Sequence, residues 1–220
     1  MPFQLKKLTP TWIVDSMEEI TPQALKTHGI TAIITDLDNT LVPWRKYDIS
    51  PRLIEWLADL KAHEITLCIA SNTIHTKRLK QISETLGIPF VEGVRKPDPD
   101  GFVRSMKLMG SAPENTAVFG DQMFTDILAG RRLGLKTILL RKPLSDHELF
   151  WTKWVRNVER YVVAHLTDKG HWPADRKIAE PLEPAYHEEL KSAFPIAAAA
   201  GALLGATAIA AAIVMWRKRR

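Results

Sequence analysis

The sequence has almost no cysteine and no clustered histidine, and these two scarcities exclude several kinds of site. Its one cysteine, Cys68, lies in the apolar run 65–70, so we expect a small buried side chain and no disulfide framework. The seven histidines are scattered from His28 to His187 without the spacing of metal ligands. The chain therefore offers no zinc site built from cysteine and histidine, and a reducing cytoplasm fits its composition.

The N-terminus lacks the features of a targeting signal. Residues 1–10 include basic side chains but no continuous apolar stretch and no small-residue cleavage site, so we expect no signal peptide. A chain of 220 residues that is 45% hydrophobic and 25% charged can bury one substantial core, as an ordinary globular protein does. Its formal net charge of +5 suits an anionic partner, such as a phosphate ester, a nucleic acid or an acidic membrane surface, without choosing among them.

Short apolar runs alternate with helical patterns over the first 140 residues. The runs, which we expect to be strands, are residues 30–34, 65–70, 88–91, 116–119 and 137–140. Helices are expected at residues 21–29, 51–63, 76–86, 99–109 and 125–133. This alternation predicts an α/β fold with a doubly wound, parallel, five-stranded sheet covered on both faces. Ligands of such sheets bind beyond the carboxyl ends of the strands.

The pattern changes after residue 140. We expect an amphipathic helix at 145–166, rich in tryptophan on one side and basic on the other, which either packs on the domain or lies at a membrane interface. It completes a domain of residues 1–166. A polar, proline-containing linker at 167–193 follows.

The end of the chain is apolar. The uncharged stretch 194–216 would be roughly 35 Å long as a helix, enough to span a bilayer, and a basic tail at 217–220 follows it. An alanine-rich helix packed on protein is the alternative. The basic tail favours a cytoplasmic C-terminus, which would place the catalytic domain on the other side of the membrane. A catalytic domain without a signal peptide is instead expected on the cytoplasmic side. A tail that enters the membrane without crossing it, monotopic or re-entrant, would satisfy both expectations.

Polar side chains follow four of the expected strands. Asp36 and Asp38 end the first apolar run, where two carboxylates would repel each other unless a cation or a reaction needs them. The later strands are followed by Ser71 and Asn72, by Arg95 and Lys96, and by Asp121 and Asp126. Phosphoryl transfer needs such a set, namely a nucleophile, positive charge around the phosphoryl oxygens and a proton donor. Carboxylates on adjacent loops also favour Mg²⁺. Taken singly, each residue could instead be a helix cap or a surface charge.

In this order the residues resemble the four motifs of the haloacid dehalogenase (HAD) superfamily phosphatases. The matching segments are Asp36-Leu37-Asp38-Asn39-Thr40, Ser71, Lys96-Pro97, and Gly120-Asp121 with Asp126. More closely, residues 5–172 are similar to the YqeG-type branch of HAD subfamily IIIA, which is related to phosphatidylglycerophosphate phosphatase. The intervals between the motifs are filled by one helix and one strand each, which leaves no room for a cap domain over the site.

The resemblance implies a role for each matching residue. Asp36 would be the nucleophile that forms an aspartyl-phosphate, Asp38 the acid and base, and Ser71 and Lys96 the contacts to the phosphoryl group. Mg²⁺ would be bound by Asp36, the backbone carbonyl of Asp38, Asp121 and Asp126. The other candidates for substrate contact are Thr40, Asn72, Arg45 and Arg95. Of these, Thr40 is expected to contact the residues that bind the ligand. The two arginines would either bind a second phosphate or be solvated surface charges.

Together these features favour a phospholipid substrate at a membrane surface. The resemblance to the YqeG-type branch implies removal of the terminal phosphate of phosphatidylglycerophosphate, which gives phosphatidylglycerol. We expect this reaction on the cytoplasmic side of a membrane, with the apolar tail as anchor. Two alternatives remain open. One is the same chemistry on a soluble metabolite or a nucleic-acid end, although no nucleic-acid partner is expected, and the other is a non-catalytic binding module on the same scaffold.

Overall fold

The computed structural model of the protein describes residues 5–145, 150–173 and 176–182. Residues 146–149 at the start of the helix expected at 145–166, the side chains of Trp151 and Trp154, and the apolar stretch 194–216 with its basic tail lie outside this description. Among the helices in the described ranges, none combines the length and the apolar character that crossing a bilayer requires.

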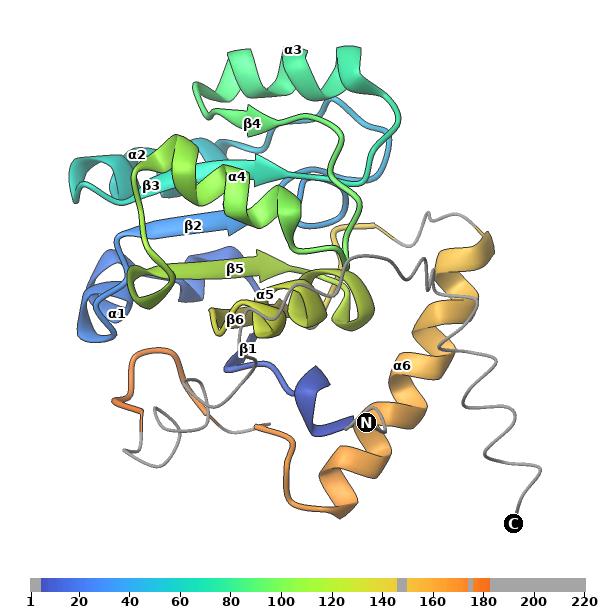
Figure 1. The fold of residues 1–220 in the computed structure, drawn as a ribbon. Helices are drawn as coiled ribbons and strands as arrows, with labels where there is room; N and C mark the ends of the chain where they lie inside the picture. The colour runs from blue at the N-terminus through green and yellow to red at the C-terminus, as the bar shows by residue number, and fades with distance from the viewer. Residues whose placement is uncertain (1–4, 146–149, 174–175, 183–220) are drawn as a thin grey trace.

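A parallel sheet forms the centre of the molecule (Figure 1), in the order β1-β6-β5-β2-β3-β4. The strands are β1 (Trp12–Val14), β2 (Ala32–Thr35), β3 (Thr66–Ala70), β4 (Phe90–Val91), β5 (Thr116–Gly120) and β6 (Lys136–Leu140). All pairs are parallel, which confirms the predicted α/β class.

The predicted number of strands is corrected from five to six. The additional strand, β1, has only three residues, too few to show a periodic pattern in the sequence. It is held at the edge of the sheet by its pairing with β6 and by Thr11, whose backbone N–H donates to the Thr137 carbonyl at 2.9 Å. The Thr137 backbone N–H in turn donates to Thr11 Oγ1 at 2.9 Å.

Helices cover both faces of the sheet. The longer ones are α1 (Pro22–Thr27), α2 (Pro51–Ala62), α3 (Thr76–Leu86), α4 (Asp100–Met109), α5 (Leu128–Arg132) and α6 (Phe150–Asp168). Short turns of helix are η1 (Leu5–Leu8), η2 (Met17–Glu19), η3 (Pro113–Asn115) and η4 (Met123–Ile127). The start of α2 follows from its sequence, because Ser50 Oγ accepts the Leu53 backbone N–H at 3.1 Å and Pro51 begins the helix. The helix expected at 125–133 is instead divided into η4, which has π-helical geometry, and α5.

Neighbouring residues of the central strands enter different cores. Ile33 of β2 packs in a cluster with Leu53 and Trp56 of α2, whereas Ile34 packs with Phe102 of α4. Since side chains alternate along a strand, both faces of β2 need apolar residues, which explains why its sequence is a continuous apolar run.

Part of the stretch expected to be a linker packs on the domain. Ile178 and Leu182 are buried in the same cluster as Trp12. The Ile178 carbonyl lies 2.7 Å from His28 Nε2, and Arg176 Nη1 donates to the Thr11 carbonyl at 3.1 Å. The chain after α6 therefore returns to β1 and supports the edge of the sheet.

Candidate active site

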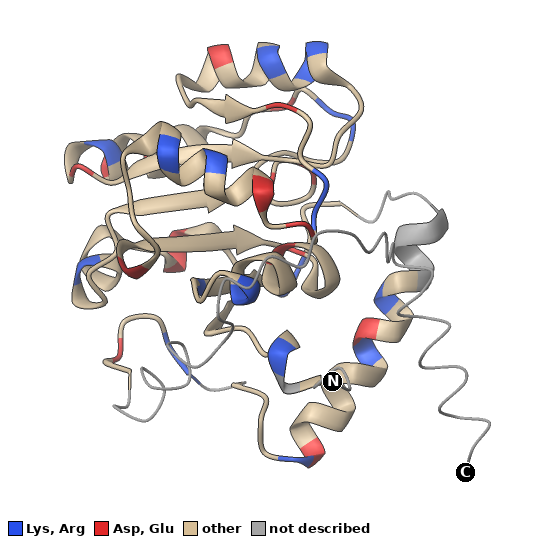
Figure 2. Cartoon of the chain, in the orientation of Figure 1, with Lys and Arg blue, Asp and Glu red and all other residues tan. Residues whose placement is uncertain are grey.

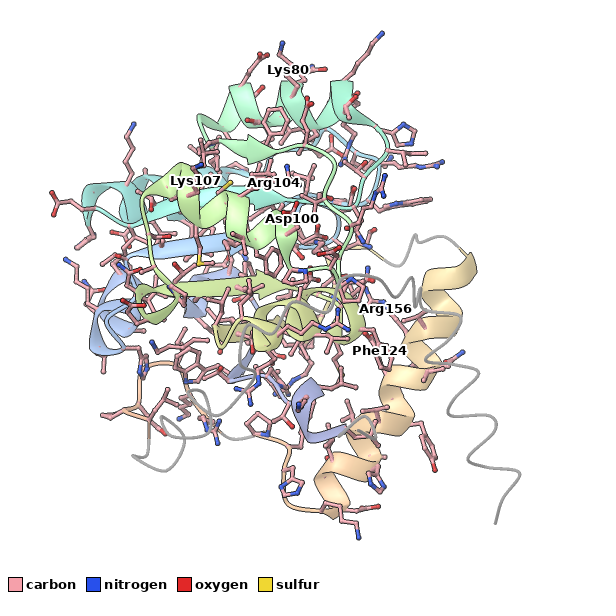
Figure 3. All side chains as sticks on the ribbon, viewed as in Figure 1. Lys80, Asp100, Arg104, Lys107, Phe124 and Arg156 are labelled. Atoms are coloured by element: carbon pink, nitrogen blue, oxygen red, sulfur yellow. The ribbon has the colours of Figure 1, made fainter. Side chains whose placement is uncertain are left out.

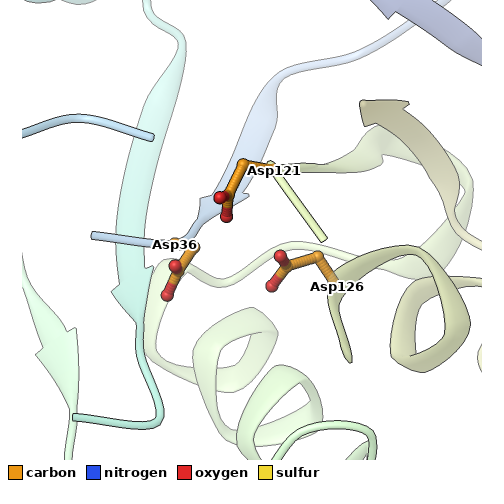
Figure 4. Close-up of side chains that lie close together, drawn as sticks. All are labelled: Asp36, Asp121 and Asp126. Carbon is orange, nitrogen blue, oxygen red and sulfur yellow. The ribbon is translucent and has the colours of Figure 1, made fainter. Parts of the chain in front are cut away.

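Three buried carboxylates meet beyond the carboxyl ends of β2 and β5. Asp36, Asp121 and Asp126 each offer an oxygen, and these oxygens lie within 4.8 Å of one another (Figure 4). Gly120 makes this approach possible, because a Cβ atom built on it would lie 2.3 Å from Asp126 Cγ. The Asp36 backbone N–H donates to the Phe119 carbonyl at 3.0 Å, which keeps Asp36 in line with the end of β2.

Lys96 connects two of these carboxylates. Its Nζ lies 2.6 Å from Asp36 Oδ1 and 2.7 Å from Asp126 Oδ1, and its side chain is 2% exposed. Asn72 fixes the loop that carries it, since the Lys96 backbone N–H donates to Asn72 Oδ1 at 2.7 Å and Asn72 Nδ2 donates to the Lys96 carbonyl at 2.9 Å. Burial alone would lower the pKa of Lys96, but Asp126 and Asp36 raise it above its ordinary value, so the side chain stays charged.

Negative charge exceeds positive charge in this buried cluster. Burial raises the pKa of Asp121 well above its ordinary value; Asp36 and Asp126 add to the rise, and Arg156 opposes it. Burial and Asp36 likewise raise the pKa of Asp126, against the effect of Lys96. A divalent cation bound by carboxylate oxygens would relieve this repulsion, and oxygen ligands are those that Mg²⁺ prefers. The residues present therefore fit a Mg²⁺ ion.

The Asp38 side chain lies outside this cluster. Its Oδ1 is 2.9 Å from a guanidinium nitrogen of Arg78 and accepts the Arg45 backbone N–H at 3.2 Å. Burial raises the pKa of Asp38; Arg78 opposes the rise and Asp36 adds to it. The two acids of the Asp-x-Asp pair thus have different surroundings, one among carboxylates and the other beside an arginine.

A cavity of about 320 Å³ opens beside these groups. The candidate residues that line it are Asp36, Asp38, Ser71, Lys96, Asn72 and Arg45. Ser71 is buried directly after β3. The other two candidates lie elsewhere: Thr40 is buried and its Oγ1 donates to Asp121 Oδ1 at 3.5 Å, whereas Arg95 is exposed on the loop before Lys96.

Arg78 is a buried contact that sequence reasoning missed. Besides its ion pair with Asp38, its Nε and Nη2 donate to the Lys46 carbonyl at 2.9 and 2.6 Å, and Nη2 donates to the Pro43 carbonyl at 3.4 Å. In the sequence it is one of several polar residues of an amphipathic helix. Nothing in that pattern indicates that its guanidinium points toward the site.

The helix α6 supplies two further missed residues, Arg156 and Glu159. Arg156, labelled in Figure 3, lies on the side of α6 that faces the sheet. Its Nη2 donates to Asp121 Oδ2, and its Nη1 donates to the Asp121 carbonyl at 3.2 Å. Glu159 Oε1 accepts the backbone N–H groups of Met123 and Phe124 at 2.7 and 3.4 Å, at the start of η4. Burial raises the pKa of Glu159 to about 7. The polar side of the predicted helix is therefore partly turned toward the protein.

The parallel sheet, with carboxylates and a buried lysine beyond its central strands, has the arrangement of an enzyme whose site lies at the carboxyl edge of the sheet, and the class of protein it fits is a hydrolase. A family model described as haloacid dehalogenase-like hydrolase matches residues 5–134. The chain belongs to this family and is a phosphatase.

Known proteins of similar sequence agree with this assignment. The chain is 44% identical over 168 residues to Probable phosphatase YqeG of Bacillus subtilis, covering 76% of this chain and 96% of that protein. It is 27% identical over 165 residues to Phosphatidylglycerophosphate phosphatase 1, chloroplastic, of Chlamydomonas reinhardtii, covering 71% of this chain and 61% of that protein. A third relative, Phosphatidylglycerophosphate phosphatase 1, chloroplastic/mitochondrial, of Arabidopsis thaliana, is 26% identical over 178 residues, covering 77% of this chain and 51% of that protein.

Proposed function

We propose that the protein is a Mg²⁺-dependent phosphatase that removes the terminal phosphate of phosphatidylglycerophosphate through an aspartyl-phosphate on Asp36. The position of Asp36 is the main observation that supports this reaction. Its carboxylate faces the cavity, lies 2.6 Å from Lys96 Nζ, and belongs to the three-carboxylate cluster. A nucleophilic anion needs this positive charge around it when it approaches a phosphate.

Asp36 and Asp38 have different roles in the proposed reaction. A carboxylate oxygen of Asp36 attacks phosphorus, and the bond from phosphorus to the ester oxygen breaks while Asp38 donates its proton to that oxygen. Asp38 then takes a proton from water, whose oxygen attacks phosphorus and breaks the bond to Asp36, which releases inorganic phosphate and restores both acids. Lys96 and Ser71 hold the phosphoryl oxygens during both steps.

Asp36, Asp121 and Asp126 would hold the metal ion. When bound, Mg²⁺ offsets the negative charge of the phosphoryl group and of the carboxylates around it. Thr40 and Arg156 keep Asp121 oriented through their hydrogen bonds to its carboxylate. Because these three carboxylates would bind the metal ion, the Asp38 side chain remains available for proton transfer.

The openness of the cavity supports a large, surface-bound substrate. The described chain between β2 and β3 contains one helix, α2, and that between β3 and β4 contains α3, with no inserted domain over the site. The names of the plant and algal relatives add phosphatidylglycerophosphate as the substrate to test first. We further propose that residues 194–216 anchor the enzyme on the cytoplasmic side of a membrane.

Phosphate release from a panel of substrates tests this function. Full-length protein should release phosphate from phosphatidylglycerophosphate in mixed micelles in a manner that a chelator abolishes, and Asp36→Asn should remove the activity. Asp98→Asn is the matched control, because Asp98 is exposed and accepts the Asp100 backbone N–H at 3.0 Å. Equal or faster turnover of soluble sugar or nucleotide phosphates would contradict the lipid substrate while keeping the phosphatase reaction.

A further inference from the structure

A second groove adjoins the catalytic cavity, and the proposed chemical steps do not use it. It has a volume of about 520 Å³ and lies between the loop after β2 and the beginning of α3. Arg45, Ile74 and His75 line both this groove and the catalytic cavity. A molecule whose phosphate is in the cavity can therefore extend directly into the groove.

Two apolar side chains at this groove face water. Ile74 is 85% exposed, the largest fraction among the exposed large apolar side chains in the described residues, and Tyr47 is 53% exposed. They lie on the loops after β3 and β2, so both stand at the carboxyl edge of the sheet. Apolar groups grouped in this way beside a site mark a contact with an apolar partner.

The charge of the groove is positive. Arg45 and Lys77 line it together with Arg78, whose charge is paired with Asp38, and none of its described lining residues is acidic. Exposed Lys46 follows on the same loop as Arg45, and the first turn of α3 is basic in Figure 2. The groove thus combines two exposed cations, Arg45 and Lys77, with two exposed apolar side chains, which complements an anionic, partly apolar ligand.

Buried contacts hold the groove in shape. Arg78 is buried beneath it and donates to the carbonyls of Pro43 and Lys46, which fixes the loop to α3. The Arg78 guanidinium also lies 5.8 Å from the centre of the Tyr47 ring, and that of Arg45 lies 4.5 Å from the Trp44 ring. Tyr47 and Arg45 are therefore presented by a loop that is fixed to α3, the helix that carries Lys77.

We propose that this groove binds an anionic phospholipid at the surface of a bilayer. The phosphodiester of the lipid lies between Arg45 and Lys77, and Ile74 and Tyr47 enter the boundary between headgroups and acyl chains. The inference rests on the proposed function in one respect, because the groove would bind the part of the lipid substrate that lies next to the phosphate that is removed. It also stands as a membrane-binding surface without any hydrolysis.

Vesicle binding by the full chain tests the groove separately from catalysis. The variant is Ile74→Ser with Lys77→Glu. The matched control, Ile54→Ser with Lys61→Glu, changes the same residue types in another groove, on α2, where Ile54 is 55% exposed. Vesicles of phosphatidylcholine with phosphatidylglycerol are compared with vesicles of phosphatidylcholine alone. The measured quantity is the affinity for vesicles with phosphatidylglycerol divided by the affinity for vesicles without it. The ratio is used because any membrane binding by the apolar stretch 194–216 would strengthen both affinities.

The groove variant should lower this affinity ratio about tenfold, and the control should leave it as in wild type. The ratio of kcat/KM on phosphatidylglycerophosphate to that on p-nitrophenyl phosphate should fall in the groove variant through a higher KM for the lipid. Equal affinity ratios in wild type and the groove variant would overturn the proposal. If wild type binds anionic vesicles through the groove but does not hydrolyse the lipid, the proposed substrate fails and the binding surface stands.

Discussion

The two halves of the site differ in burial and in what they contribute. The inner half consists of Asp36, Asp121, Asp126 and Lys96, all buried and in contact with one another or with Arg156. The outer half consists of Asp38 with Arg78 and of the loops that carry Arg45 and Ile74. Charges are most strongly coupled where water is excluded. In the proposed function the inner half supplies the nucleophile and the metal ligands, whereas the outer half supplies the proton donor, Asp38, and the groove that would bind the rest of the substrate.

The largest expected effect is that of Lys96→Met in the inner half. The change leaves Asp36 and Asp126 without their ammonium partner, so we expect a loss of about 3 kcal/mol in the free energy of unfolding and of at least about a thousandfold in kcat. Urea unfolding and phosphate release measure the two. Mg²⁺ should restore part of the stability, because it would supply positive charge to the same carboxylates.

Lys80→Met is the control for that experiment. Lys80 is exposed and pairs with Glu84 at 3.9 Å on α3, and such surface pairs contribute about 0.5 kcal/mol or less. A stability loss in Lys96→Met no larger than in this control would mean that the inner charges are not coupled.

The next effect is that of Gly120→Ala, which changes the packing of the inner half without changing its charges. The added Cβ would lie 2.3 Å from Asp126 Cγ and would displace that carboxylate. We expect roughly a hundredfold loss of kcat and a weaker rise of the melting temperature with Mg²⁺, since small misplacements of reacting groups are costly. Gly110→Ala is the control, because a Cβ there meets nothing within 4 Å although its φ is +66°. It should lower stability by about 1 kcal/mol and leave activity intact.

In the outer half, Arg78→Met should slow catalysis in a way that depends on the leaving group. Arg78 holds Asp38, the proposed acid, so protonation of the leaving oxygen should suffer by about tenfold to a hundredfold in kcat for an alkyl phosphate. p-Nitrophenyl phosphate, whose leaving group needs little protonation, should lose much less. Arg78→Lys should recover part of the rate. An equal loss on both substrates would contradict a role limited to leaving-group protonation, and would place the effect in hydrolysis of the aspartyl-phosphate, which both substrates share, or in a general disturbance of the loop.

The smallest effect concerns Glu159, which supports the inner half from α6. Its pKa rises from 4.5 to about 7 on folding, so the folded state binds the extra proton and wild type should lose stability as the pH rises from about 5 to 7. Glu159→Gln keeps an oxygen for the Met123 backbone N–H but has no charge to bury. Its free energy of unfolding should therefore vary less over this range, by about 1 to 3 kcal/mol, as urea unfolding at several pH values would measure.

A feature of this structure can be predicted from the sequence when neighbouring residues determine it, and not when it depends on contacts between residues far apart in the chain. The central strands were predictable because burial on both faces requires continuous apolar runs. Asp36 and Asp121 were site candidates because each follows the end of such a run, and Lys96 because it lies on the loop after one and matches a motif of the family. The edge strand β1 was missed because three residues carry no pattern. Arg78 and Arg156 were missed because a helical pattern predicts which residues are polar but not which carboxylate they contact.

The most direct test of the proposed reaction is to find the phosphate on the protein. After a single turnover with ³²P-labelled substrate and a rapid acid quench, we expect one hydroxylamine-sensitive label in the peptide that contains Asp36, and none in Asp36→Asn. Rapid product release with no label, or with the label on another residue, would contradict the assignment of Asp36 as the nucleophile.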